Sequence, residues 1–142
     1  MKTQFFWVTK VLNMKKIILF SVLTLVACSN SGNAETFTIR ECNEIANEIN
    51  STMSNMHVDS ITILKNAICH RPSKLNYMYQ MTVSATEDEV NFAGMRRKNI
   101  QTWCTDPDMK YLLDRLSGVA YTYRDKNGVY IGEYGFKKSD CG

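Results

Sequence analysis

The clearest change of hydrophobic period lies in the last third of the chain. Between Met109 and Leu116, apolar residues recur every three to four positions, which predicts a short helix. Asp106 is suited to cap this helix and Pro107 to begin it, because the first helical N–H has no intrahelical partner to lose. Gly118 is the predicted stop, since glycine adopts positive φ without a Cβ penalty.

The residues after this helix alternate with a period of two. Apolar or aromatic side chains alternate with others over residues 119–124, and a second such run covers residues 129–136. This alternation predicts two strands. Asn127 and Gly128 lie between them and are the favoured pair for a type I′ turn, whose twist matches that of paired strands. We therefore expect a β-hairpin.

A similar set of elements precedes it. Thr38 and Glu41 form a capping-box pattern, and apolar residues at helical spacing follow to about Asn55. Residues 60–69 and 75–83 then alternate as two strands, which predicts a second hairpin with a longer turn.

Two details refine this part of the chain. The alternation slips near Lys65, where we expect a β-bulge. A second capping-box pattern, Thr86 with Glu89, precedes a helix that carries Trp103 and Cys104 toward the core.

The predicted order of elements is α-β-β-α-α-β-β. Two hairpins alternating with helices favour a single α+β domain, with one antiparallel sheet of about four strands and helices on one face. The last strand places Tyr130, Tyr134 and Phe136 on one face. If that face is open, these aromatic side chains form a partner-binding patch. If both faces are covered, they are core residues, and the sequence leaves both alternatives open.

The beginning of the chain resembles a bacterial lipoprotein signal. Lys15 and Lys16 precede an apolar run, residues 17–26, which has the length of a signal core and is too short to span a membrane. Leu25-Val26-Ala27-Cys28 then resembles a lipobox, in which the cysteine becomes the first mature residue and carries the lipid. The alternative is ordinary signal-peptidase cleavage after Ala34, which would remove Cys28.

These motifs predict the domain boundaries. Residues 1–27 form the signal peptide, with Met14 as the better start, residues 28–35 a lipidated tether, and residues 36–142 a periplasmic domain. Ser29 follows the lipidated cysteine, where aspartate commonly signals retention in the inner membrane. The predicted location is therefore the outer membrane, with palmitate-type acylation holding the domain on the periplasmic side.

Removing the leader changes the charge of the chain. The full sequence carries a formal net charge of +3, but the leader contains four lysines. The mature part has 13 Lys and Arg against 14 Asp and Glu, a net charge of −1. Nucleic-acid binding domains are usually basic, so a nucleic-acid partner is not expected.

Four cysteines remain after the lipid-bearing one, and an even number in an exported domain suggests disulfides. Three connectivities are possible. We favour Cys42–Cys69 and Cys104–Cys141, because each pair joins neighbouring elements. A zinc site is the alternative, but the chain has no Cys-x-x-Cys pair.

Motifs for catalysis are missing from the sequence. His57 and His70 are the only histidines, and neither accompanies a nucleophile motif. There is no phosphate-binding glycine loop and no His-Glu-x-x-His. We therefore predict a binding protein rather than an enzyme, with no catalytic residue, metal or cofactor.

The second half of the chain resembles the AspS-type (GspS-β) pilotin lipoproteins of type II secretion. Besides the lipobox at Cys28, the resemblance rests on Phe92, Trp103-Cys104-Thr105-Asp106-Pro107, Gly118, Tyr121, the hairpin with its aspartate and glycine, and Asp140-Cys141-Gly142. In that family a helix ending in Cys-x-Asp-Pro precedes a two-stranded hairpin, and a near-terminal Cys-Gly closes a disulfide. Cys42 and Cys69 depart from the family pattern.

The resemblance implies a chaperone function. Such pilotins bind the C-terminal segment of a secretin subunit in the periplasm and travel with it to the outer membrane. Two alternatives have other envelope proteins as partners. One is a periplasmic inhibitor or immunity lipoprotein against a lysozyme-like or toxin enzyme, and the other is a conjugation, exclusion or type IV secretion accessory lipoprotein.

Overall fold

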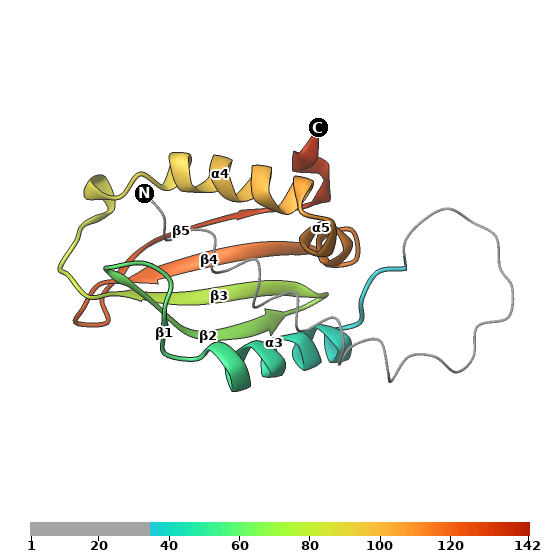
Figure 1. Ribbon diagram of the computed structural model, residues 1–142, viewed down its shortest axis with the longest axis horizontal. Coiled ribbons are helices and arrows are strands. Elements are labelled where there is room, and N and C mark those ends of the chain that lie inside the picture. Colours follow the sequence, from blue (N-terminus) through green and yellow to red (C-terminus); the bar gives the residue numbers. More distant parts are fainter. Residues whose placement is uncertain (1–34) are drawn as a thin grey trace, which may run out of the picture. The chain divides into compact units, whose positions relative to one another are not determined.

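The computed structural model describes residues 35–142 of the chain, and the predictions for the signal peptide, the lipobox at Cys28 and residues 28–34 of the tether lie outside that part. The ribbon in Figure 1 shows an extended sheet flanked by helices. The helices and strands are, in chain order, α3 (Ile39–Met53), β1 (Met56–His57), β2 (Thr62–His70), β3 (Lys74–Met81), η2 (Glu87–Glu89), α4 (Phe92–Thr105), α5 (Pro107–Leu113), β4 (Gly118–Arg124), β5 (Tyr130–Phe136) and η3 (Lys138–Cys141).

The prediction of a single α+β domain with helices and two hairpins is confirmed, and the sheet has five strands in the order β1-β2-β3-β4-β5. The sheet is mixed rather than wholly antiparallel, because β3 and β4 pair in parallel from Lys74↔Gly118 to Gln80↔Arg124. Between these two strands α4 returns the chain to the end of the sheet where β3 began, as Figure 1 shows. A crossover of this kind is what joins parallel neighbours.

Several local features match the sequence pattern. Thr38 and Glu41 form the capping box of α3, with the Thr38 N–H donating to the Glu41 carboxylate at 2.7 Å. Asp106 caps α5 by accepting from the N–H groups of Asp108 and Met109. The expected irregularity in β2 lies between Leu64 and Asn66.

Other local predictions are wrong at the level of detail. The Thr86–Glu89 box begins only the short η2, and Asn91 caps α4 instead. Helix α5 ends at Leu113, so Gly118 begins β4 rather than stopping a helix. The strand β1 was not predicted, because its residues continue the apolar spacing of α3.

The hairpin turn also differs from the predicted type. A type I′ turn needs positive φ at both central residues. Within residues 35–142 only Gly128 has positive φ in this turn, at 82°. The carboxylate of Asp125 accepts from the N–H groups of Asn127 and Val129, and the Gly128 N–H donates to the Asp125 carbonyl at 3.0 Å. These side-chain bonds select a turn that needs glycine at one position only.

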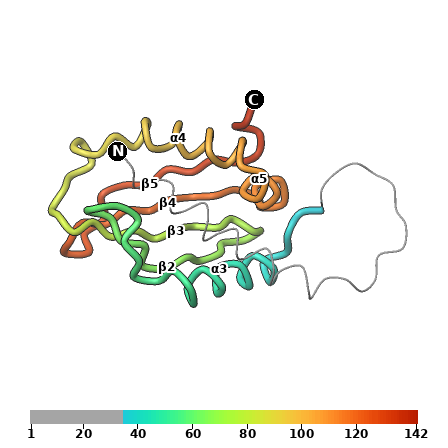
Figure 2. Tube along the Cα trace, in the orientation of Figure 1, coloured from blue at the N-terminus to red at the C-terminus, as the bar shows by residue number. Residues whose placement is uncertain are grey.

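All three α-helices bury residues in one core on one face of the sheet. Cys42, Ala46 and Ile49 of α3, Trp103 of α4 and Leu113 of α5 join the inward residues of β2 to β5 in that core. Helix α3 packs along β2 and α4 along β5, at opposite edges of the sheet (Figure 2). The helices therefore cover the face that carries the tyrosines of β3, β4 and β5.

Helix α3 also satisfies the outer edge of β2. The side-chain amide of Asn50 donates to the Ala67 carbonyl at 2.9 Å and accepts from the Ala67 N–H at 2.6 Å. The Ser54 hydroxyl donates to the Lys65 carbonyl at 2.8 Å. These bonds satisfy backbone groups of β2 that would otherwise need a neighbouring strand.

The sheet has two ends that differ in content, and we name them here. The proximal end holds Phe37, the β2–β3 turn, α5, the start of β4 and η3. The distal end holds the β1–β2 loop, η2 and the β4–β5 turn. In Figure 1 the proximal end lies at the right and the distal end at the left.

Candidate functional site

The aromatic residues predicted as a partner-binding patch do not share one environment. Tyr134 and Phe136 are buried, with 8% and 5% of their surface exposed, whereas Tyr130 is 51% exposed. Tyr134 stacks against Tyr121 with ring centroids 5.1 Å apart, and Phe136 lies edge-on to Trp103. The expectation of an open aromatic face is therefore wrong for Tyr134 and Phe136, because α4 covers that face.

The buried tyrosines are bonded within the core. The Trp103 indole N–H donates to the Tyr121 hydroxyl at 2.8 Å, and the Tyr123 and Tyr134 hydroxyls are 3.4 Å apart. Burial raises the pKa of Tyr79 and Tyr121 well above the ordinary range. These side chains remain neutral and hold the sheet to its helices, which is a structural role.

The distal end gathers most of the large apolar side chains that remain exposed. Ile61 and Val83 are each 40% exposed, and Val129 is 62% exposed beside Tyr130. These four residues form what we call the distal patch: Ile61, Val83, Val129 and Tyr130. Exposed apolar side chains that gather in one place mark candidate sites for a protein partner.

Backbone hydrogen bonds tie the segments of the distal patch together. The Thr82 N–H donates to the Ile61 carbonyl at 2.7 Å, which joins the β1–β2 loop to the end of β3. The Lys126 N–H donates to the Val83 carbonyl at 3.1 Å, which joins that segment to the hairpin turn. The patch is thus presented by three loops that support one another.

At the distal end the exposed acidic side chains outnumber the basic ones, Arg124 and Lys126. Partial desolvation raises the pKa of Tyr130, and the negative charges of Glu133 and Glu87 raise it further. Asp59 and the acidic η2, Glu87–Glu89, belong to the same end of the sheet. An apolar patch with an acidic rim suits a segment that presents apolar and basic side chains.

The structure contains the two disulfides that the sequence favours. Cys42 of α3 is bonded to Cys69 of β2, and Cys104 of α4 to Cys141 of η3. Both lie at the proximal end, away from the distal patch.

Chemical groups elsewhere in the described part of the chain are dispersed. His57 and His70 are exposed and lie at the ends of β1 and β2. Between residues 35 and 142, no three His, Cys, Asp or Glu side chains come together as a metal site. None of the helices in that range is long and apolar enough to cross a membrane.

Sequence reasoning found Tyr130 but missed Val129, and it also missed Ile61 and Val83. Both belong to the predicted strands, residues 60–69 and 75–83, but in the structure β2 begins at Thr62 and β3 ends at Met81, so each lies just outside a strand. One signal could have found them. Each lies between a strand and a loop, and the two loops turn at the same end of the sheet.

No protein-family model matches this chain, and no curated protein matches it in sequence. Three solved structures share its fold. A proposed secreted protein of Pseudomonas aeruginosa aligns with a TM-score of 0.63 and 12% identity, covering 73% of this chain and 92% of that one.

The other two are pilotins. The pilotin EpsS of the type 2 secretion system of Vibrio vulnificus aligns with a TM-score of 0.58 and 10% identity, over 73% of this chain and 91% of that one. The type II secretion pilotin AspS of Vibrio cholerae aligns with a TM-score of 0.54 and 14% identity, over 72% of this chain and 91% of that one. The domain therefore has a pilotin-type fold, which extends over both halves of the domain and not only the half that resembles the family in sequence.

Proposed function

We propose that this chain is an outer-membrane lipoprotein and a non-catalytic binding protein, acting as a pilotin-like chaperone for a secretin or another secretion-system component. The observation that carries the proposal is the fold, which the pilotins EpsS and AspS share over nearly their whole length. The lipobox at Leu25–Cys28 supports it independently, because a lipid anchor supplies the membrane address that such a chaperone needs.

The distal patch is the proposed partner site. It combines exposed apolar side chains with an acidic rim at the end of the sheet that carries no disulfide. The proposed partner is the C-terminal segment of a secretin subunit, presenting apolar side chains to Val129 and Tyr130 and basic ones to Glu87. Short segments of this kind bind through a few apolar anchors in a surface depression or edge.

The use of ionisable groups supports a binding role over a catalytic one. Hydrogen bonds from Thr38 lower the pKa of Glu41, and bonds from Thr86 lower the pKa of Glu89. Asp106 is used as a helix cap and Asp125 as the acceptor of the hairpin turn. Each of these carboxylates supports local structure instead of facing a cavity.

The anchor is tested by palmitate labelling of cells that express the wild type or Cys28→Ala. We expect label on the wild type and none on the variant, with the wild type in the outer-membrane fraction. An unlabelled wild type would overturn the lipoprotein part of the proposal.

The partner is tested by in-cell crosslinking and recovery from the outer membrane. We compare the wild type with the double variant Val129→Ser/Tyr130→Ser, and with Ile68→Ser as a matched control. Ile68 is 37% exposed on β2, outside the distal patch. We expect a secretin subunit with the wild type and with the control, and at least about tenfold less with the double variant, because loss of central anchors costs about 2 kcal/mol or more.

Other outcomes identify the alternatives. Recovery of a hydrolase in place of a secretin would indicate an inhibitor or immunity protein. Recovery of a transfer-apparatus component would indicate a conjugation or type IV secretion accessory. Equal recovery of a secretin with the double variant would place the binding site elsewhere on the domain.

A further inference from the structure

Basic side chains gather at the proximal end of the sheet, opposite the distal patch. They come from three segments that lie far apart in the chain: Arg71 of the β2–β3 turn and Lys74 at the start of β3, Lys110 and Arg115 from α5 and its C-terminus, and Lys137 and Lys138 from the residues after β5. The domain as a whole is slightly acidic, so this concentration of positive charge is local.

The tertiary structure brings these segments together. A Cβ atom at Gly118 would lie 3.8 Å from Cβ of Lys137 and 4.0 Å from Cγ of Lys74. The segments that carry Lys74 and Lys137 therefore both lie next to the start of β4. Leu116, Ser117, Lys137, Lys138 and Ser139 line one shallow depression at this end. The Ser117 N–H donates to the Ser73 hydroxyl and links the β2–β3 turn to the same place.

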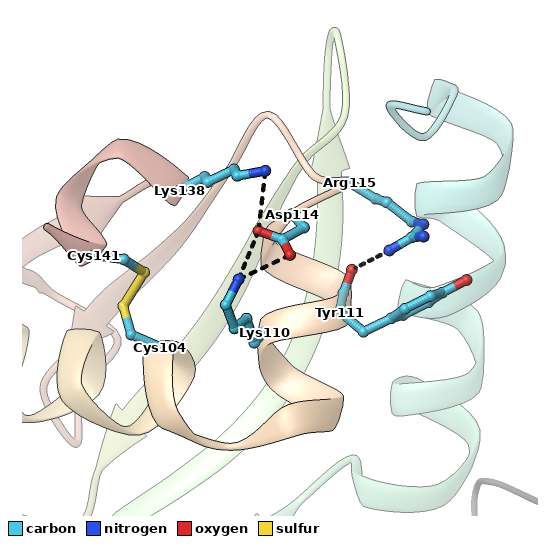
Figure 3. A network of polar contacts seen from close by, with 7 residues as sticks. All are labelled: Cys104, Lys110, Tyr111, Asp114, Arg115, Lys138 and Cys141. Atoms are coloured by element: carbon cyan, nitrogen blue, oxygen red, sulfur yellow. Dashed lines mark hydrogen bonds and ion pairs between the residues drawn. A yellow bond between two sulfur atoms is a disulfide. The ribbon is translucent and has the colours of Figure 1, made fainter. Parts of the chain in front are cut away.

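The acidic groups nearby offset only part of this charge. Asp114 is held between Lys110 and Lys138, at 3.0 and 3.3 Å from their Nζ atoms, as Figure 3 shows. Asp140 accepts from the Lys137 N–H and pairs with Arg96. Among residues 35–142, Arg71, Lys74 and the Lys137 ammonium form no ion pair.

An exposed aromatic side chain on α5 lies against one of these cations, Arg115. Tyr111 is 51% exposed, and the guanidinium of Arg115 lies over its ring, 3.6 Å from the centroid. In Figure 3 the two side chains lie on the side of α5 away from Lys110 and Lys138. An amphipathic ring with adjacent cations is typical of residues that sit at the headgroup level of a membrane.

The chain enters the domain at this same end. The Phe37 N–H donates to the Arg115 carbonyl at 2.8 Å, so the start of the described backbone is bonded to the residues just after α5. Phe37 lies nine positions after Cys28, which limits the fully extended tether to about 30 Å. A tether of that length lets the basic end reach the membrane surface.

We propose that the proximal end, through Lys74, Lys110, Arg115, Lys137 and Lys138, lies against the anionic phospholipid surface of the leaflet that holds the lipid anchor, and that this contact turns the distal patch toward the periplasm. The inference rests on the proposed anchoring at Cys28. The lipid holds the domain near the bilayer, and the charge distribution decides which side faces it. Each basic side chain at an anionic surface strengthens binding by about fivefold, and salt weakens the effect.

The test is lysine acetylation of the full-length, lipidated protein reconstituted into vesicles, read by mass spectrometry. One set of vesicles contains phosphatidylglycerol with phosphatidylethanolamine, and the other contains only phosphatidylcholine. We expect Lys74, Lys110, Lys137 and Lys138 to react several-fold more slowly in the anionic vesicles at low salt. Lys98 and Lys126 are exposed elsewhere on the domain and serve as internal controls whose rates should not change.

A pair of matched variants tests the role of charge. Lys137→Glu/Lys138→Glu should abolish the protection of Lys74, whereas Arg97→Glu/Lys98→Glu on α4 has the same change in charge and should leave it intact. Thermal unfolding of both variants confirms that they fold. Equal labelling in the two kinds of vesicle, or loss of protection in both variants, would overturn the inference.

Palmitate labelling of the same preparation separates this inference from the anchor. If the protein carries lipid and the proximal lysines are not protected, the orientation is wrong and the anchor stands. If the protein carries no lipid, the anchor is wrong, and the same labelling with the unlipidated chain added to the vesicles still decides. Protection of the proximal lysines then supports the proposed contact with the anionic membrane. If these lysines are not protected, the proposed contact is wrong.

Discussion

The two ends of the sheet are built differently. The proximal end carries both disulfides, the cluster of lysines around Asp114 and the bond between Phe37 and α5. The distal end has no disulfide and consists of three loops joined by backbone hydrogen bonds, with four apolar side chains exposed. One end is covalently closed and basic, and the other is apolar with an acidic rim.

This difference places the covalent links that stabilise the fold at one end and the proposed partner site at the other. Covalent links at the proximal end constrain the unfolded chain without using the loops of the distal end. Exposed apolar side chains contribute little to the fold, so the distal patch can vary without unfolding the domain. In the proposed function the domain is anchored at one end and binds at the other, and this separation suits both roles.

Removing a disulfide should have the largest effect and should act at the proximal end. The bonds span sequence separations of 27 and 37 residues. Closing loops of this size stabilises the folded state by about 4 kcal/mol in the chain-entropy model. We expect Cys42→Ala/Cys69→Ala, or Cys104→Ala/Cys141→Ala, to lower the free energy of unfolding by about that amount, as measured by urea denaturation.

Hydrogen exchange of the same variants shows where the loss acts. Faster exchange should appear in the β2–β3 turn for the first variant and in η3 for the second. Faster exchange confined to the β4–β5 turn would show that the two ends are not separate in the way proposed.

Two tyrosines of β5 should differ sharply, although they are four residues apart. Tyr134 packs under α4, and Tyr134→Ala should lower the free energy of unfolding by about 3 kcal/mol, through lost burial and the cavity left behind. Tyr130→Ala, at an exposed site, should change it by less than about 0.5 kcal/mol. Thermal or urea unfolding measures both. A large loss for Tyr130→Ala would mean that the distal patch is structural.

The turn of the distal hairpin should depend on one glycine. Gly128 has φ of 82°, and no atom lies within 4 Å of where its Cβ would be placed. Gly128→Ala should therefore cost about 1 kcal/mol through backbone conformation alone. Gly128→Asn is the control, and it should cost less because asparagine tolerates this conformation. Equal unfolding midpoints for the two variants would contradict this account.

The smallest effects should distinguish the two ends by their response to salt. Bonds and charges from Lys110 and Lys138 lower the pKa of Asp114 at the proximal end. Hydrogen bonds from the Thr86 N–H and hydroxyl lower the pKa of Glu89 at the distal end. A pKa lowered by folding gives stability that is present above the unfolded pKa, near 4 for both groups, and lost as the pH falls through the folded value.

We therefore expect the stability advantage of the wild type over Asp114→Asn, and over Glu89→Gln, to shrink as the pH falls below about 4. At pH 6, added salt should reduce the advantage over Asp114→Asn, because ion pairs are screened. It should leave the advantage over Glu89→Gln nearly unchanged, because the partners of Glu89 are neutral. Urea unfolding at several pH values, with and without salt, measures both. The same salt response at both sites would remove this distinction between the ends.

Local signals in the sequence predicted much of this domain. The capping box of α3, the Asp106–Pro107 start of α5 and the bulge in β2 each depend on a few neighbouring residues, and each is found in the structure. The hairpins follow from alternation with a period of two. Predictions failed where a local pattern has more than one outcome, as at the Thr86 box, which begins a single 3₁₀ turn instead of the long helix.

The candidate site was predicted only in part, for a related reason. Alternation places Tyr130, Tyr134 and Phe136 on β5 but does not state which face of the sheet the helices cover. The register shift between Tyr123 and Arg124 further separates Tyr130 from the buried residues. Ile61 and Val83 become neighbours only through the Thr82–Ile61 hydrogen bond across two strands.

The sequence by itself determined the main helices and the strands other than β1, their order, the α+β class and the cysteines available for two disulfides, because these depend on periodicity, caps and composition within short windows. Only the tertiary structure decided the parallel pairing of β3 with β4, the burial of Tyr134 under α4 and the division into a basic and an apolar end. These features depend on contacts between residues far apart in the chain, such as Asn76 with Thr122 and Asn99 with Tyr134. No local pattern in the chain records such contacts, because they form only when the crossover through α4 and α5 sets β4 beside β3.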